Sequence, residues 1–357
     1  MSTNNSEMDS SDNDNNDTPK CCASCGITNF HHNEVVKLKT CVACKSVQYC
    51  SISCQKDHRP QHKQFCKLRA AEIYNEKLFQ QPDSTYEGDC PICFLPIPID
   101  PEESTRMFCC LKLICNGCQY AYEKREAEEA TASSCPFCRQ PRSFPQKDDV
   151  VETDLLKRIE VNDAVAMREM GIKRYHEGNL DDALHYWKRG AKLGDARAHY
   201  QLSWMYHDLN GDVHPGVEKD VTRGVYHMKE AAIGGHPEAR YNLGIHEYRE
   251  GKRVKAVKHW IIAANLGNVE SMEVLERCFA LGEISEEDFV SALRAHRAAI
   301  DATRSPQRLL AKESLRNVLD SNTDTDFSWC CWQHVTLAFL AILFCERFWA
   351  MITSVMS

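Results

Sequence analysis

The distribution of cysteine is the feature that most constrains this chain. Sixteen of its twenty cysteines lie between Cys21 and Cys138, mostly in pairs separated by two or three residues. Such pairs each supply two ligands to a tetrahedral zinc ion. A secreted disulfide scaffold is the alternative, but residues 1–20 are mostly Asn, Asp and Ser, with no apolar signal segment. We therefore expect Zn²⁺ as the cofactor and a reducing location, the cytoplasm or the nucleus.

Length and composition predict several domains. A chain of 357 residues is too long for one zinc module, and its net charge of −8 argues against a nucleic-acid footprint over the whole chain. Changes in composition along the sequence predict six segments. They are a disordered acidic arm (1–20), a first zinc module (21–67), a linker helix (68–87), a second zinc module (88–145), a helical repeat region (150–308) and a hydrophobic C-terminal segment (327–356).

The first zinc module contains eight ligands. They come as four pairs, Cys22-x2-Cys25, Cys41-x2-Cys44, Cys50-x3-Cys54 and His62-x3-Cys66. Eight ligands make two tetrahedral sites. Cys21 is an alternative to Cys22, although the two-residue gap to Cys25 favours Cys22. We expect a helix to follow over Lys67–Gln80, ended by Pro82.

The segments Tyr49-Cys50-Ser51 and His62-Lys63 through Cys66 resemble the MYND-type zinc finger. The resemblance implies docking of short proline-containing peptides from partner proteins. This sequence departs from the family pattern at Arg59, where the family usually has Trp. The resemblance also implies interleaved ligand sets: Cys22, Cys25, Cys50 and Cys54 for the first zinc, and Cys41, Cys44, His62 and Cys66 for the second.

Basic residues are concentrated around this module. Nine Lys or Arg residues lie from Lys20 to Ala70, where the acidic residues are Glu34 and Asp57. Zinc-bound thiolates offset part of this charge, and aromatic residues for base stacking are few. We therefore expect proteins, not nucleic acid, as partners.

The second module resembles a RING-type finger through Cys90-Pro91-Ile92-Cys93 and Cys135-Pro136-Phe137-Cys138-Arg139. The pattern departs in the middle, where adjacent cysteines stand in place of a Cys, one intervening residue and a His. One of the adjacent cysteines could be a spare thiol. The resemblance implies Cys90, Cys93, Cys115 and Cys118 for a third zinc, and Cys109, Cys110, Cys135 and Cys138 for a fourth.

Two functions are open for this second module. RING fingers hold a ubiquitin-conjugating enzyme, and Ile92, Pro136 and Arg139 stand where the family places its contacts with that enzyme and with ubiquitin. The chain would then be an E3 ubiquitin ligase with the repeats as substrate receptor. Alternatively the module only binds proteins, because Pro between paired cysteines is also a good turn residue. No catalytic residues are expected in the chain itself.

The region from Val150 contains an internal repeat. The pattern small-Ala-x-x-Gly-polar recurs, and its alanines Ala191, Ala232 and Ala264 are 41 and 32 residues apart. Such periods indicate stacked helical hairpins. The pattern resembles Sel1-like repeats, which implies an α-solenoid scaffold, with a long insert over Asn210–Glu218 and a degenerate last unit over Val269–Arg308. An unrelated helical bundle is the alternative. The fold class is therefore mainly α, with two small zinc modules ahead of a solenoid.

Phe327–Cys345 is a run of 19 residues without Asp, Glu, Lys or Arg. It is near the minimum length for a membrane helix, and a helix that caps the last repeat is the alternative. If it anchors the chain, the zinc modules face the cytosol. The sequence as a whole predicts a zinc-binding scaffold or adaptor for proteins.

Overall fold

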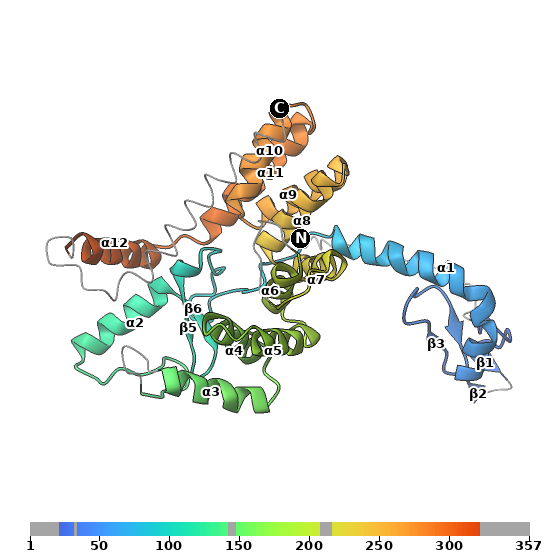
Figure 1. The fold of residues 1–357 in the computed structure, drawn as a ribbon, viewed down its shortest axis with the longest axis horizontal. Coiled ribbons are helices and arrows are strands. Elements are labelled where there is room, and N and C mark those ends of the chain that lie inside the picture. Colours follow the sequence, from blue (N-terminus) through green and yellow to red (C-terminus); the bar gives the residue numbers. More distant parts are fainter. Residues whose placement is uncertain (1–20, 32–33, 142–147, 208–215, 322–357) are drawn as a thin grey trace, which may run out of the picture. The chain divides into compact units, whose positions relative to one another are not determined.

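The computed structural model describes residues 21–31, 34–141, 148–207 and 216–321 (Figure 1). The chain divides after Gln81 into two compact units. The predicted arm over 1–20, the hydrophobic segment over 327–356 and most of the insert after Asn210 lie outside the described residues.

The first unit is a small finger that continues into one long helix. Two antiparallel pairs, β1 (Phe30–His31) with β2 (Glu34–Val35) and β3 (Lys39–Thr40) with β4 (Gln48–Tyr49), precede α1 (Ile52–Leu78). The helix predicted over Lys67–Gln80 is only the second half of α1. The Ser51 side chain starts the helix earlier because its Oγ accepts from the Cys54 N–H at 3.1 Å.

The second unit begins with a zinc-module fold. A 3-10 turn, η1 (Pro101–Glu103), leads into the hairpin of β5 (Ser104–Met107) and β6 (Lys112–Cys115), followed by α2 (Asn116–Glu128). Ile97, Met107 and Ile114 are buried among the cysteines and form the core of this module.

The repeat region is a series of antiparallel helical hairpins in which each helix packs against the next, from α3 to α11. The helices are α3 (Asp148–Glu160), α4 (Ala164–His176), α5 (Leu180–Lys192), α6 (Ala196–Tyr206), α7 (Val221–Ile233), α8 (Pro237–Arg249), α9 (Arg253–Asn265), α10 (Val269–Ala280), α11 (Glu286–Ala302) and α12 (Pro306–Ser321).

The last two residues of the repeated pattern, Gly followed by a polar residue, form a Gly-polar mark that has a local structural cause. Gly194, Gly235 and Gly267 end their helices with φ angles of 91°, 82° and 96°, a region that favours glycine. The polar residue after the glycine caps the next helix: Asp195 accepts from the Ala198 N–H at 2.7 Å. The mark is thus a helix end and a helix start in adjacent residues.

Two other glycines let paired helices approach closely. A Cβ on Gly171 would lie 2.5 Å from the Trp187 ring, and one on Gly244 would lie 2.4 Å from Trp260. Both indoles donate from Nε1 to a carbonyl three residues before the glycine: Trp187 to Arg168 at 3.3 Å and Trp260 to Tyr241 at 3.2 Å. The two hairpins therefore repeat the same contact.

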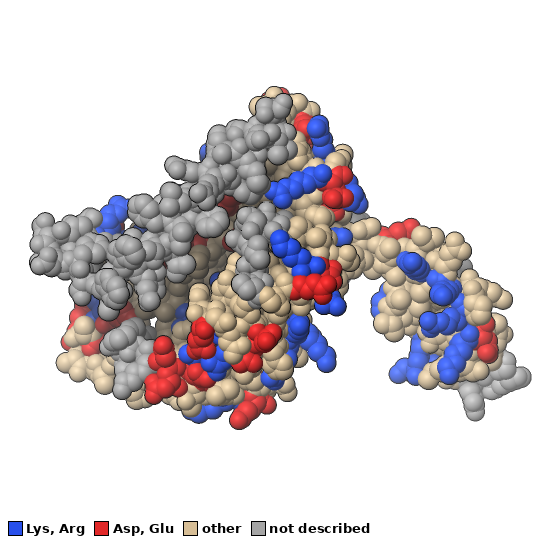
Figure 2. Space-filling model, in the orientation of Figure 1, with Lys and Arg blue, Asp and Glu red and all other residues tan. Residues whose placement is uncertain are grey.

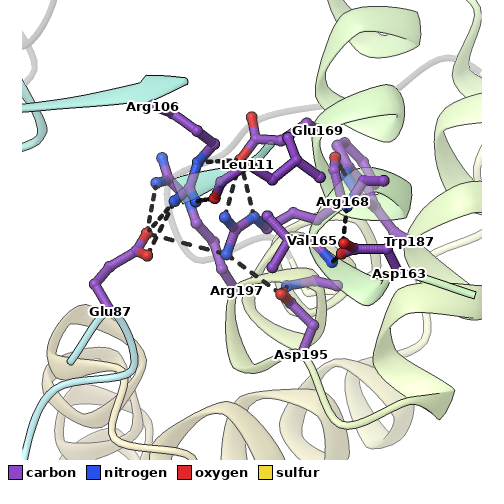
Figure 3. A network of polar contacts seen from close by, with 12 residues as sticks. Glu87, Arg106, Leu111, Asp163, Val165, Arg168, Glu169, Trp187, Asp195 and Arg197 are labelled. Atoms are coloured by element: carbon purple, nitrogen blue, oxygen red, sulfur yellow. Dashed lines mark hydrogen bonds and ion pairs between the residues drawn. The ribbon is translucent and has the colours of Figure 1, made fainter. Parts of the chain in front are cut away.

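A network of ion pairs joins the zinc module of the second unit to the first repeat (Figure 3). Arg106 on β5 bonds Glu87 at 3.0 Å and Glu169 on α4 at 3.1 Å. The buried Arg168 bonds Glu169 at 2.9 Å and Asp195 at 3.3 Å. Burial opposes ionisation of Glu87, but Arg168 and Arg106 outweigh it and lower its pKa.

Apolar and aromatic contacts reinforce this joint. Leu111, at the tip of the β5–β6 hairpin, is buried in one cluster with Leu155 of α3 and Met167 of α4. Tyr86 stacks on His236, with ring centroids 4.4 Å apart. The second zinc module and the solenoid are therefore one folded body.

Helix α12 returns to the zinc module and packs against α2. The approach is close because Gly117 has no side chain: a Cβ there would lie 2.7 Å from the backbone N of Arg308. Within the described ranges no helix combines the length and the apolar character of a bilayer span. The predicted anchor over 327–356 is outside those ranges.

Candidate metal centres

The described chain brings together four groups of four metal-binding side chains. In each group the ligand atoms all lie within 4.8 Å of one another. Sulfur atoms around a tetrahedral zinc ion are separated by about 3.8 Å, since the Zn–S bond is about 2.3 Å. The residues therefore fit zinc.

The first group comprises Cys22, Cys25, Cys50 and Cys54. Cys50 Sγ lies 3.5 Å from both Cys25 Sγ and Cys54 Sγ. Cys54 is in the first turn of α1 and Cys50 directly follows β4, so the hairpin and the helix together position this pair. Cys22 is buried and Cys21 is exposed and outside the group. The two-residue gap had favoured Cys22.

The second group comprises Cys41, Cys44, His62 and Cys66. Cys41 Sγ lies 3.7 Å from Cys66 Sγ, and Cys44 Sγ lies 3.4 Å from His62 Nε2. His62 and Cys66 are one turn apart on α1, so their side chains share one face. The interleaving of the two groups is the arrangement that the MYND resemblance implies.

The third group comprises Cys90, Cys93, Cys115 and Cys118. Cys93 Sγ lies 3.8 Å from Cys115 Sγ, and the Cys115 N–H donates to Cys90 Sγ at 3.5 Å. The pair Cys115 and Cys118 spans the end of β6 and the first turn of α2. The end of the hairpin thus faces the Cys90 turn.

The fourth group includes both of the adjacent cysteines, together with Cys135 and Cys138. Cys109 Sγ lies 3.4 Å from Cys138 Sγ, and Cys110 Sγ lies 3.7 Å from Cys135 Sγ. Adjacent side chains of a strand point to opposite faces, but these two lie in the tight loop of the hairpin, which closes with Leu111 at a φ of 58°. The turn brings both sulfurs to one side.

The same backbone turn follows four of the five Cys-x2-Cys pairs, all except Cys115 and Cys118. The residue after the second cysteine has a positive φ, and its N–H bonds the carbonyl of the first cysteine at 2.8 to 3.0 Å. These residues are Gly26, Lys45, Phe94 and Arg139. Only the glycine gave a signal in the sequence.

The thiols of each group influence one another. Burial raises the pKa of Cys22, but backbone N–H groups, chiefly that of Cys25, outweigh it and lower the pKa to about 6. Contacts with the Cys25 and Cys54 thiols raise the pKa of Cys50 to about 12. Neighbouring thiolates repel, and a divalent cation among them removes that repulsion.

Arg308 hydrogen-bonds the third group from outside its four ligands, and sequence reasoning missed this contact. Its guanidinium donates to Cys93 Sγ at 3.5 Å, to the Leu95 carbonyl at 3.2 Å and to the Pro96 carbonyl at 2.7 Å. N–H donors of this kind stabilise metal-bound thiolates. No local signal marks Arg308, because more than 200 residues separate it from its partners.

The residues predicted to contact a conjugating enzyme are accessible. Ile92 is 39% exposed, Arg139 is exposed and Pro136 is partly buried. They lie in the turns of the third and fourth groups.

Two families match the chain. Residues 22–66 match the MYND finger, and residues 164–195, 196–236 and 237–268 match the Sel1 repeat. The chain carries a MYND finger and three Sel1 repeats. Each matched repeat begins at the first residue of a helix, α4, α6 or α8, and contains one hairpin. The MYND finger and the four cysteine-rich groups make Zn²⁺ the cofactor of this chain.

Relatives are similar over the repeat region. An uncharacterized Sel1-like repeat-containing protein of Schizosaccharomyces pombe is 26% identical over 134 residues, which cover 37% of this chain but only 19% of that protein. A Sel1 repeat protein from Oxalobacter formigenes is 26% identical with a TM-score of 0.36, over 43% of this chain and 66% of that one. A protective antigen of uropathogenic Escherichia coli is 29% identical with a TM-score of 0.34, over 43% and 33%.

Proposed function

We propose that this protein is a zinc-dependent adaptor that holds two protein partners on two separate bodies. The observation that carries the proposal is the division after Gln81, with the second zinc module bonded into the repeat solenoid. A MYND finger and Sel1 repeats both mediate protein–protein interactions, and here each has its own folded unit. An adaptor needs two such surfaces.

The proposal assigns one structural zinc ion to each of the four groups. Each group offers four protein ligands, which closes a tetrahedral site and leaves no position for a substrate. The thiol ligands require a reducing location, so we place the protein in the cytoplasm or the nucleus. Flotation of the full chain with membranes, compared with a chain that ends at Asp326, tests the predicted C-terminal anchor.

The MYND finger exposes apolar side chains that could meet a short proline-containing peptide. Val42 and Ile52 are 80% and 65% exposed, and Phe65 on α1 is 53% exposed. Lys and Arg side chains also gather on this unit (Figure 2). Aliphatic and aromatic side chains of this kind suit proline rings.

Fluorescence anisotropy with a panel of labelled proline-containing peptides tests peptide binding by the MYND finger in the full, zinc-loaded chain. Binding should disappear in Cys50→Ser, which removes a ligand of the first group, and persist in the matched variant Cys135→Ser. Equal binding by both variants would contradict the assignment of the peptide to the MYND finger.

A ubiquitin ligase is the second candidate function. The exposure of Ile92 and Arg139 favours it, since both side chains are free to meet a conjugating enzyme and ubiquitin. The test measures discharge of ubiquitin from a panel of charged conjugating enzymes by the full chain. Acceleration that is lost in Ile92→Ala and in Arg139→Ala supports the ligase, and no acceleration from the folded chain rejects it.

A further inference from the structure

A groove lies between the start of the second zinc module and the later repeats. Its volume is about 800 Å³. One wall is the segment from Asp83 to Glu103, and the other is built from α8, the junction of α9 with α10, and α11. It involves none of the four metal groups.

The groove has an apolar floor. Ile97 and Leu266 are buried, while Ile99 and Ile300 are partly exposed beside them. Val269 is 53% exposed at its edge. Such a floor accommodates aliphatic side chains.

The charge in the groove has one sign. Six carboxylates line it and no Lys, Arg or His does; they are Asp83, Asp89, Asp100, Glu103, Glu238 and Glu270. Lys312 Nζ pairs with Glu103 at 2.8 Å and His236 Nδ1 with Glu238 at 3.0 Å. None of the other four forms an ion pair with a residue that the structure describes.

We propose that this groove binds an extended peptide segment of a partner in which Lys or Arg alternates with aliphatic residues. Side chains of an extended chain point alternately to two sides, so the aliphatic ones face the floor and the cations face the carboxylates. An anionic partner would be repelled. The proposal specifies the partner chemistry of the solenoid body named above, and so rests on the adaptor function.

The experiment uses the full, zinc-loaded chain and a labelled six-residue probe with the sequence lysine, leucine, arginine, valine, lysine, leucine. A probe with glutamate in place of each basic residue is the ligand control. Anisotropy should report binding of the basic probe alone, and binding should weaken as salt is raised.

Two double variants locate the site. Asp89→Asn with Asp100→Asn removes two charges from the groove and keeps side-chain size; Asn also caps η1 as Asp100 does, by accepting from the Glu102 N–H. Glu128→Gln with Glu129→Gln removes two exposed charges at the end of α2, outside the groove. We expect the groove variant to bind about tenfold more weakly and the control variant to bind like the native chain.

Three results would overturn the proposal: no binding of the basic probe to the folded chain, equal weakening by both double variants, or displacement of the probe by spermine at similar concentrations. The first means the groove is not a docking site. The second indicates general attraction to an acidic protein, and the third a small polycation as the occupant. Cys50→Ser distinguishes this test from the test of the MYND finger, because binding of the basic probe to the groove should survive that change.

Discussion

Single residues outside the cysteines determine how firmly the zinc modules are held. Arg308 is the clearest example, because it lies on α12 yet bonds the turn around Cys93. The spacing of the cysteines and of His62 predicted the ligand pairs, the resemblances to MYND and RING fingers implied how the pairs combine, and the structure brings those groups together. The sequence gave no information about Arg308, whose role depends on a contact between distant parts of the chain.

Replacing Arg308 with Ala should release zinc from the third group about tenfold faster, since outer contacts of this kind contribute roughly 10- to 100-fold to metal affinity. A chromogenic chelator measures the release from the intact chain. Arg304→Ala is the control, because Arg304 is exposed and pairs with Asp301. Equal rates in the two variants would show that Arg308 does not support the metal.

At the level of elements, the solenoid depends on close approach within each hairpin. Gly-to-Ala changes normally stabilise a helix by about 1 kcal/mol. Gly244→Ala should do the opposite, by about 1 to 3 kcal/mol, because the new Cβ would overlap the Trp260 ring. Urea unfolding measures the effect.

The double variant Gly244→Ala with Trp260→Leu is the control for this prediction. A smaller side chain at position 260 relieves the overlap, so Trp260→Leu should cost less in the chain that already carries Gly244→Ala than in the native chain. Purely additive effects would show that the glycine serves another purpose.

A pair of histidines between α6 and α7 should make the solenoid sensitive to acid. His199 Nδ1 lies 2.9 Å from His227 Nδ1. Burial, with the nearby His199, lowers the pKa of His227 from its ordinary 6.5 to about 4. The neutral pair therefore contributes its full stability above about pH 6.5, and this contribution is lost as the pH falls towards 4.

Melting of the helical circular dichroism signal between pH 7 and pH 4.5 tests the histidine prediction. The native chain should lose stability over that range, and His227→Gln should lose less, because Gln takes up no proton. A steeper loss in the variant would be inconsistent with a protonation cost at His227.

The junctions between the repeat helices were readable from the sequence, while the start of α1 and the docking of distant elements were not. The Gly-polar mark located the helix junctions because it combines a left-handed glycine with a helix cap, as at Gly194 and Asp195. The start of α1 was predicted too late, since its cap, Ser51, lies between zinc ligands and not before an apolar run. The doubt whether Cys109 and Cys110 both bind metal arose because their hairpin loop is set by the pairing of β5 with β6.

At the scale of the whole molecule, the second zinc module is part of the solenoid and the MYND finger is not. The hairpin that carries Cys109 and Cys110 also buries Leu111 among the first repeat helices. Loss of zinc from the fourth group should therefore loosen the solenoid itself. No pattern in the sequence indicated this dependence, because the two regions have different compositions and periods.

Cys135→Ser should lower the melting temperature of the bulk helical signal, by several degrees for each kcal/mol lost. Cys50→Ser should leave that transition nearly unchanged, because its group belongs to the first unit. Circular dichroism with zinc present compares the two. Equal shifts in both variants would mean that the second zinc module is not built into the repeats.

Native mass spectrometry of the full chain, purified under reducing conditions, counts the structural zinc ions that organise this protein scaffold. We expect four zinc ions per chain, with fewer ions in Cys50→Ser and in Cys135→Ser. Two ions in the native chain, with the cysteines from Cys90 to Cys138 oxidised or metal-free, would contradict this expectation.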